Sequence, residues 1–97
     1  MSVRYVGPAG EELLEAISYY EARVTGLGRR LFGEVQRAER LVSQFPKATT
    51  EVRPAVRRCL IRKFPYALIY TIQEQEIVVL AFAHLNRQPG YWKSQRP

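Results

Sequence analysis

The sequence predicts an α+β domain, in which a helical hairpin packs on one face of a small antiparallel sheet. Two observations lead to this fold class. Apolar residues recur at helical spacing in two successive stretches between residues 13 and 45. Farther along, two short runs rich in β-branched and aromatic residues, Ala67–Ile72 and Ile77–Ala83, are separated by a short polar segment. The chain of 97 residues suffices for one modest core, so we expect a single domain over residues 1–97.

The N-terminal part predicts a short strand and a first helix. Val3–Val6 alternates like an edge strand, and Gly7-Pro8 ends it. Pro8 suits the first turn of the helix that follows. Several glutamates crowd the expected helix start, where the helix dipole favours negative charge. The apolar stripe of this helix comprises Leu13, Ala16 or Ile17, Tyr20 and Val24.

A second helix follows a short break at Thr25–Gly28. We expect it to begin near Arg29 and to stop at Pro46. Two amphipathic helices separated by so short a connection lie antiparallel, and the sheet must cover their stripes. The stripe of the second helix comprises Leu31, Val35, Ala38, Val42 and Phe45.

The rest of the chain predicts three strands and a tail. Lys47–Pro54 is expected to be a connection without regular structure, and Val56–Lys63 alternates weakly like a strand. Phe64-Pro65-Tyr66 gives a tight connection, because Pro65 restricts the preceding residue to extended conformations. The predicted order is therefore β-α-α-β-β-β, in a sheet of three or four strands, with a polar C-terminal tail over residues 85–97.

The two apolar runs are expected to form a β-hairpin with Glu74-Gln75 as its two-residue loop. This register pairs Ile72 with Ile77, Tyr70 with Val79 and Leu68 with Ala81. Neither face of the hairpin is plainly polar, so we expect both to be covered, one by the helices and one by a partner. The predicted core includes Tyr70, Leu80, Phe82, Val35 and Val42.

The net charge of +6 is unevenly distributed. Residues 1–52 carry seven Lys/Arg and seven Glu, whereas residues 53–97 carry eight Lys/Arg and two Glu. A basic C-terminal half implies an acidic partner: a nucleic acid, an acidic protein segment or an anionic surface. The alternative interpretation is that the charge only keeps a small domain soluble.

The sequence also predicts where the protein resides. No run is long enough to span a bilayer, and the N-terminus has no signal-peptide pattern. Cys59 is the single cysteine, so the chain cannot form an internal disulfide. We expect Cys59 to be a small residue of the core. Together these features predict a cytoplasmic protein that does not engage a membrane.

Several chemistries are excluded by composition. One Cys and one His do not build a zinc site unaided, and neither phosphate-binding glycine motif is present. The chain contains no Asp, which excludes a Ser-His-Asp triad. A binding protein or a metal-free ribonuclease remains, and no cofactor is expected.

Several short motifs follow one another in a set order. They are Tyr19-Tyr20-Glu21, Gly26-Leu27-Gly28 with Phe32, Phe45-Pro46, Arg58, Phe64-Pro65-Tyr66 with Ile69-Tyr70, and His84, Arg87, Pro89 and Tyr91-Trp92. In this order and spacing, over about residues 5 to 93, the chain resembles the ParE/RelE superfamily of bacterial type II toxins, in its ParE-like (plasmid-stabilisation) branch. The resemblance implies a toxin held inactive by a cognate antitoxin, whose acidic and partly disordered C-terminal segment wraps the helices and sheet.

The superfamily has two known activities. RelE-like members are ribosome-dependent messenger-RNA endonucleases that need no metal, and they require a base, an acid and cations around the scissile phosphate. ParE-like members generally lack this set and poison DNA gyrase by binding it. The leading expectation is therefore a gyrase-binding toxin without catalytic residues. One alternative is a RelE-like endonuclease, and another is an inactive homologue that only binds antitoxin.

Each candidate site residue also has a structural reading. His84, the only histidine, is either a general base or a cap on the core. Arg87 either binds phosphate or fastens the tail with a salt bridge. Tyr91 and Trp92 either stack on bases or, as adjacent tail aromatics more often do, pack the tail back onto its own domain. Under the endonuclease alternative the catalytic residues are His84, Arg87 and Tyr91, helped by Arg58 and Arg62, which share a strand side and are expected to line one groove. The candidates for binding the target or the antitoxin are Arg58, Arg62, Lys63, Arg87, Tyr91 and Trp92.

Overall fold

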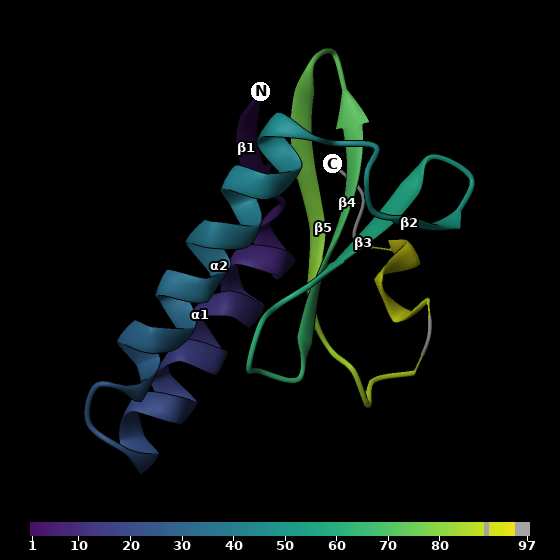
Figure 1. Ribbon diagram of the computed structural model, residues 1–97. Helices are drawn as coiled ribbons and strands as arrows, with labels where there is room; N and C mark the ends of the chain where they lie inside the picture. The colour runs from purple at the N-terminus through teal and green to yellow at the C-terminus, as the bar shows by residue number, and fades with distance from the viewer. Residues whose placement is uncertain (89, 95–97) are drawn as a thin grey trace.

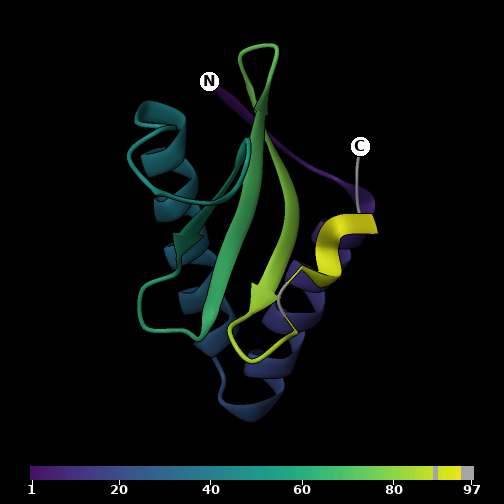
Figure 2. The same ribbon diagram turned by 90° about the vertical axis from the view of Figure 1, so that its right-hand side faces the viewer.

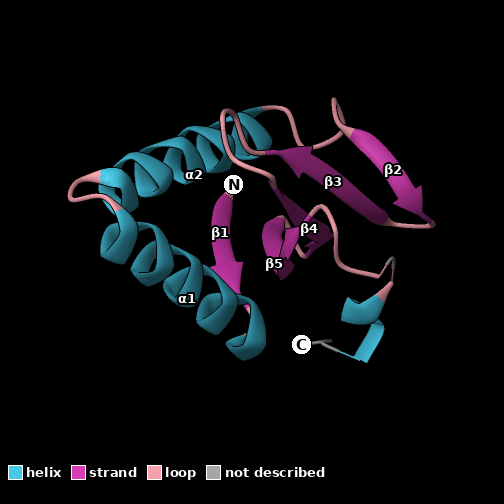
Figure 3. Ribbon diagram, turned by 90° about the horizontal axis from the view of Figure 1, so that it is seen from below, coloured by secondary structure: helices cyan, strands magenta, loops and turns pink. Residues whose placement is uncertain are grey.

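The structure is a computed structural model that describes residues 1–88 and 90–94. Two helices form a hairpin on one side of a sheet, and a short 3-10 helix lies on the other side (Figures 1 and 3). Pro89 and residues 95–97, which belong to the predicted tail, lie outside the described residues. The elements in chain order are β1 (Ser2–Tyr5), α1 (Gly7–Arg23), α2 (Leu27–Gln44), β2 (Thr50–Arg53), β3 (Val56–Leu60), β4 (Tyr66–Gln73), β5 (Glu76–His84) and η1 (Tyr91–Ser94).

The sheet has five strands in the order β1-β5-β4-β3-β2. This arrangement confirms the predicted α+β class, with two differences in the sheet. β1 runs parallel to β5, so the sheet is mixed. A short turn forces neighbouring strands to run antiparallel, but β1 and β5 lie far apart in the sequence and no such turn joins them.

The second difference is β2, which the sequence analysis assigned to an irregular connection. Thr50 pairs with Arg58 and Glu51 with Arg57, so β2 forms an antiparallel edge next to β3. All four residues of β2 are exposed. Apolar alternation, the signal of a half-buried strand, is therefore absent from this segment.

The predicted β4–β5 hairpin is confirmed near its turn. Glu74 and Gln75 have φ values of 49° and 65°, the left-handed pair that a type I′ loop requires. Ile72 pairs with Ile77 as predicted, but beyond Tyr70 the predicted register is wrong and Leu68 lies opposite Phe82. The register shift places an extra residue in β5, a bulge that no turn residue or glycine in the sequence marks.

The α1–α2 connection explains two of the motifs. The carboxylate of Glu21 accepts hydrogen bonds from the backbone N–H groups of Gly26, at 2.9 Å, and Gly28, at 3.0 Å. These bonds, with that of Gly26 the stronger influence, hold the pKa of Glu21 below its usual range. Gly26 has a φ of 89°, and a Cβ on Gly28 would lie 2.7 Å from the carbonyl oxygen of Ile17. Glu21 therefore caps the start of α2, and Gly28 lets the two helices approach closely.

The core lies between the helical hairpin and the sheet. The exposed fractions of Tyr70, Leu80, Phe82, Val35 and Val42 are all 2% or less, which confirms the predicted core. The ring of Tyr66 stacks on Phe82, with centroids 4.6 Å apart. Cys59 is buried as expected, and burial raises the pKa of its thiol. Neither α1 nor α2, nor any other helix within the described ranges, has the length and apolar character needed to cross a membrane.

Candidate target-binding site

A groove opens on the side of the sheet away from the helices. It has a volume of about 330 Å³ and lies between the sheet and the C-terminal tail. Its floor contains the small aliphatic side chains of Ala67, Ile69 and Ala83, which are all buried. Tyr66 contacts Tyr20 of α1, and strand residues alternate between faces, so Ala67 and Ile69 point away from the helices. Figure 2 shows the tail and η1 facing this side of the sheet. We call this feature the sheet–tail groove.

The rim of the sheet–tail groove is basic. Arg53 of β2, Arg58 of β3, and Arg87 and Lys93 of the tail all line it. No Asp or Glu belongs to the lining among the residues that the structure describes. The groove therefore presents an aliphatic floor beneath four cationic side chains, an arrangement that attracts a ligand carrying negative charge.

Backbone hydrogen bonds fold the tail back onto the sheet. The N–H of Leu85 donates to the carbonyl of Pro65, at 2.9 Å, and the N–H of Arg87 donates to the carbonyl of His84, at 3.0 Å. Trp92 is only 7% exposed and lines the groove as part of the wall that the tail provides. Trp92 therefore packs onto its own domain, which is one of the two interpretations of the tail aromatics.

Glu12 of α1 joins three elements at this wall. Its Oε1 accepts the backbone N–H of Phe82 in β5, at 3.1 Å, and its Oε2 accepts the hydroxyl of Tyr91, at 2.8 Å. β1 pairs with β5 only as far as Val79, so the N–H of Phe82 lies beyond the end of that pairing. Glu12 thus continues the edge of the sheet and fixes the tail against it.

The expectation that the glutamates lie at the start of the helix, where its dipole favours them, is wrong for Glu12. α1 begins at Gly7, and its first turn contains no acidic residue. Glu12 instead lies beside the buried side chains of Ala9, Leu13 and Ala16. This spacing of three and four residues is the signal that would have placed Glu12 on the packed side of the helix.

The electrostatics of Tyr91 follow from this packing. Burial, together with the carboxylate of Glu12, raises the pKa of Tyr91 well above its usual range, although Arg87 opposes the rise. The guanidinium carbon of Arg87 lies 3.8 Å from the centroid of the Tyr91 ring, a cation–π contact within the tail. Among the residues that the structure describes, Arg87 therefore fastens the tail through an aromatic ring and makes no salt bridge.

His84 ends β5 at the border of the groove. Its Nδ1 accepts the backbone N–H of Asn86, at 3.0 Å, and its ring contacts the edge of Tyr66. The hydroxyl proton of Tyr91 is directed to Glu12, so it is not offered to a ligand in the groove. The groove thus gathers cations for binding an anion. The two candidates for proton transfer, His84 and Tyr91, both form structural contacts.

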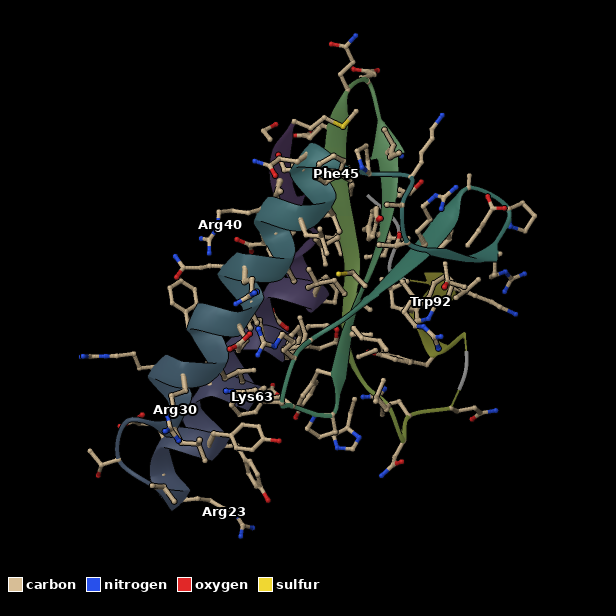
Figure 4. All side chains as sticks on the ribbon, in the orientation of Figure 1. Arg23, Arg30, Arg40, Phe45, Lys63 and Trp92 are labelled. Carbon is tan, nitrogen blue, oxygen red and sulfur yellow. The ribbon has the colours of Figure 1, made fainter. Side chains whose placement is uncertain are left out.

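Two predicted site residues lie elsewhere, so the expectation that Arg58 and Arg62 line one groove is wrong. β3 ends at Leu60, and strand alternation no longer applies beyond it. Arg62 lines a separate hollow beside α2. Lys63 precedes Phe64, whose ring contacts Tyr20 of α1, and Figure 4 shows Lys63 away from Trp92. Two cationic residues of the groove were missed: Arg53, because β2 was not recognised, and Lys93, which no motif marks.

The hollow that contains Arg62 has a different chemistry. It has a volume of about 370 Å³ and is lined by Leu41 and Leu60, which are 46% and 58% exposed. Phe45, one turn beyond Leu41, is 57% exposed. Oε1 of Glu34, which also lines the hollow, is buried without a hydrogen-bond partner among the described residues. We call the exposed apolar side chains Leu41, Phe45 and Leu60, with this hollow, the α2 surface.

Comparison with known proteins identifies relatives of this fold. Residues 3–89 match the family model described as "ParE toxin of type II toxin-antitoxin system, parDE". A solved structure titled "Chromosomal ParDE TA system from P. aeruginosa" has a TM-score of 0.61 and 19% sequence identity, and the match covers 87% of this chain and 95% of that chain. At this identity the likeness concerns the fold. No curated protein matches the chain. Because the family model covers most of its length, this chain belongs to the ParE family of toxins of type II toxin–antitoxin systems.

Proposed function

We propose that this ParE-family toxin inhibits DNA gyrase by binding it and that a cognate antitoxin neutralises it. Membership of the ParE family carries this proposal, because the resemblance to ParE-like toxins, which generally poison gyrase by binding it, implies the same activity here. The sheet–tail groove supports it: cations surround an aliphatic floor, whereas the hydroxyl of Tyr91 is hydrogen-bonded to Glu12. Such a groove binds a partner without needing a proton-transfer step.

The α2 surface supports binding of the antitoxin. Its exposed leucines can accept apolar anchors, and stable complexes depend on such burial. The buried, unpaired oxygen of Glu34 can accept a hydrogen bond from a bound partner. Arg37, Arg40 and Arg62 also line this hollow, so an acidic antitoxin segment is complementary to it.

A message endonuclease is the second candidate, because one specific observation favours it. Arg58, His84, Arg87 and Tyr91 line one groove, so most residues named for that chemistry lie together. If the tail moved and released Tyr91 from Glu12, these groups would surround a bound phosphate. A third candidate, a homologue that only binds antitoxin, predicts no toxicity at all.

Induced expression without antitoxin distinguishes the three candidates. Plasmid supercoiling and the integrity of messenger RNA are measured in the same cells soon after induction. A gyrase poison disturbs supercoiling while messages stay intact, and coexpressed antitoxin reverses the effect. Early cleavage of messages with normal supercoiling would support the endonuclease, and unimpaired growth at confirmed expression would support the antitoxin-binding homologue.

A further inference from the structure

The sheet–tail groove and the α2 surface differ in the partner that each suits. The α2 surface exposes large apolar side chains, as surfaces of long-lived complexes do. The sheet–tail groove has a small aliphatic floor under a strongly basic rim. Charges at a rim accelerate encounter and select the partner more than they prolong its residence. The groove therefore suits a partner that is captured electrostatically.

The aromatic side chains of the groove do not favour a nucleic acid. Single-stranded nucleic acids bind by stacking bases on exposed aromatic faces. Trp92 is 7% exposed, and Arg87 already covers one face of the Tyr91 ring. The apolar side chains of the lining that remain exposed are aliphatic, Val52 at 37% and Leu85 at 52%, so the groove takes an aliphatic side chain better than a base.

We propose that the sheet–tail groove binds an extended acidic peptide segment of the toxin's target protein. Carboxylates of the segment lie against Arg53, Arg58 and Lys93, and one aliphatic side chain packs against the exposed aliphatic lining, Val52 and Leu85. The antitoxin uses the separate α2 surface. The identity of the partner rests on the proposed function, whereas the chemistry of the groove is tested without it.

The first test uses the purified chain and short labelled probes. One probe is a peptide of glutamates around a central leucine, the second replaces that leucine with serine, and the third is an oligothymidylate of similar charge. Fluorescence anisotropy at near-physiological salt, where exposed charges are screened beyond about 8 Å, reports local contacts. We expect the leucine peptide to bind about fivefold tighter than the serine peptide and tighter than the oligothymidylate.

Charge reversal tests whether the groove is the place of binding. Arg53→Glu and Arg58→Glu should each weaken the leucine peptide about tenfold, since each replaces an attraction by a repulsion. Arg30→Glu is the matched control, because Arg30 is an exposed arginine of α2 that lies away from the groove (Figure 4). Thermal melting of every variant confirms that the fold survives. Equal binding of both peptides, tighter binding of oligothymidylate, or an equal loss in Arg30→Glu would overturn the proposal.

The second test uses the same variants on the target. If the wild-type chain inhibits gyrase supercoiling, Arg58→Glu should lose at least about tenfold in potency while its affinity for antitoxin stays within about twofold. Full potency of folded Arg58→Glu would overturn the use of this groove and leave gyrase inhibition standing. A wild-type chain without effect on gyrase would instead contradict the proposed target, and the peptide measurements would still decide the chemistry of the groove.

Discussion

Removing the carboxylate of Glu12 is expected to release the tail and weaken the edge of the sheet. Glu12→Ala deprives two donors of their acceptor: the N–H of Phe82, at 3.1 Å, and the hydroxyl of Tyr91, at 2.8 Å. A buried donor left unpaired costs about 1–3 kcal/mol, and a hydrogen bond to a charged group contributes about 1.5–3 kcal/mol. Phe82 is 2% exposed, so water does not readily replace the lost acceptor. We therefore expect a loss of about 2–4 kcal/mol in the free energy of unfolding.

Trp92 provides the assay, because it is the only tryptophan in the chain and lies in the tail. In Glu12→Ala its emission should shift to longer wavelength below the melting temperature, since the indole becomes exposed to water. Glu12→Gln is the matched control: its amide can accept from Phe82 and donate to Tyr91, so it should lose less than about 1 kcal/mol. Tyr91→Phe removes only the tail bond and should shift the emission with a smaller loss of stability. Unchanged emission and stability within about 0.5 kcal/mol in Glu12→Ala would refute this account of the tail.

Three further predictions concern the helices and the antitoxin. Gly28→Ala places a Cβ 2.7 Å from the carbonyl oxygen of Ile17 and should lower the free energy of unfolding by about 1–2 kcal/mol. Gly33→Ala is the control, since a Cβ there would have nothing within 4 Å, and it should raise the free energy of unfolding by about 0.5–1 kcal/mol. Equal midpoints of urea unfolding in the two variants would contradict the close helix approach. The lowered pKa of Glu21 stabilises the fold above the ordinary carboxyl pKa of about 4.3, and this contribution is lost as pH falls through the folded-state pKa. Denaturation measured across this acid range should show the loss in wild type and a smaller one in Glu21→Gln, and identical pH profiles would contradict the cap. Salt should slow association with antitoxin more than it speeds dissociation, because charge steers encounter and apolar anchors set residence time. Association and dissociation rates that do not change with salt would show that Arg37, Arg40 and Arg62 do not guide this encounter.

Local sequence patterns predicted most of the fold because each element carries its own periodicity. The stripe of α2 and the apolar runs of the hairpin identify elements that bury one face, and the structure confirms these elements. The placement of Phe45 in the stripe is wrong, because Phe45 follows the end of α2 and is 57% exposed. β2 exposes every side chain, and its strand geometry comes from pairing with β3, which lies later in the chain. The bulge in β5 likewise depends on how the strand packs, so neither feature could be derived from local pattern.

The candidate site was predicted only in part, because it depends on how the tail folds. The motif residues Arg58, His84, Arg87 and Tyr91 do lie together. Arg62 was grouped with them by strand alternation, which stops at the end of β3. Local spacing could have placed Glu12 on the packed side of α1, but it does not encode the partners of Glu12, which are 70 and 79 residues away.

The most direct test of inhibition by binding is the effect of His84→Gln on supercoiling and messages in one expression experiment. A gyrase poison needs no proton transfer, so its activity does not depend on the imidazole, whose Nδ1 accepts the N–H of Asn86. Folded His84→Gln should therefore remain toxic, disturb supercoiling as the wild type does and leave messenger RNA intact, with melting temperature as the folding control. Loss of toxicity together with loss of message cleavage, in a variant that melts like the wild type, would contradict inhibition by binding and establish an endonuclease.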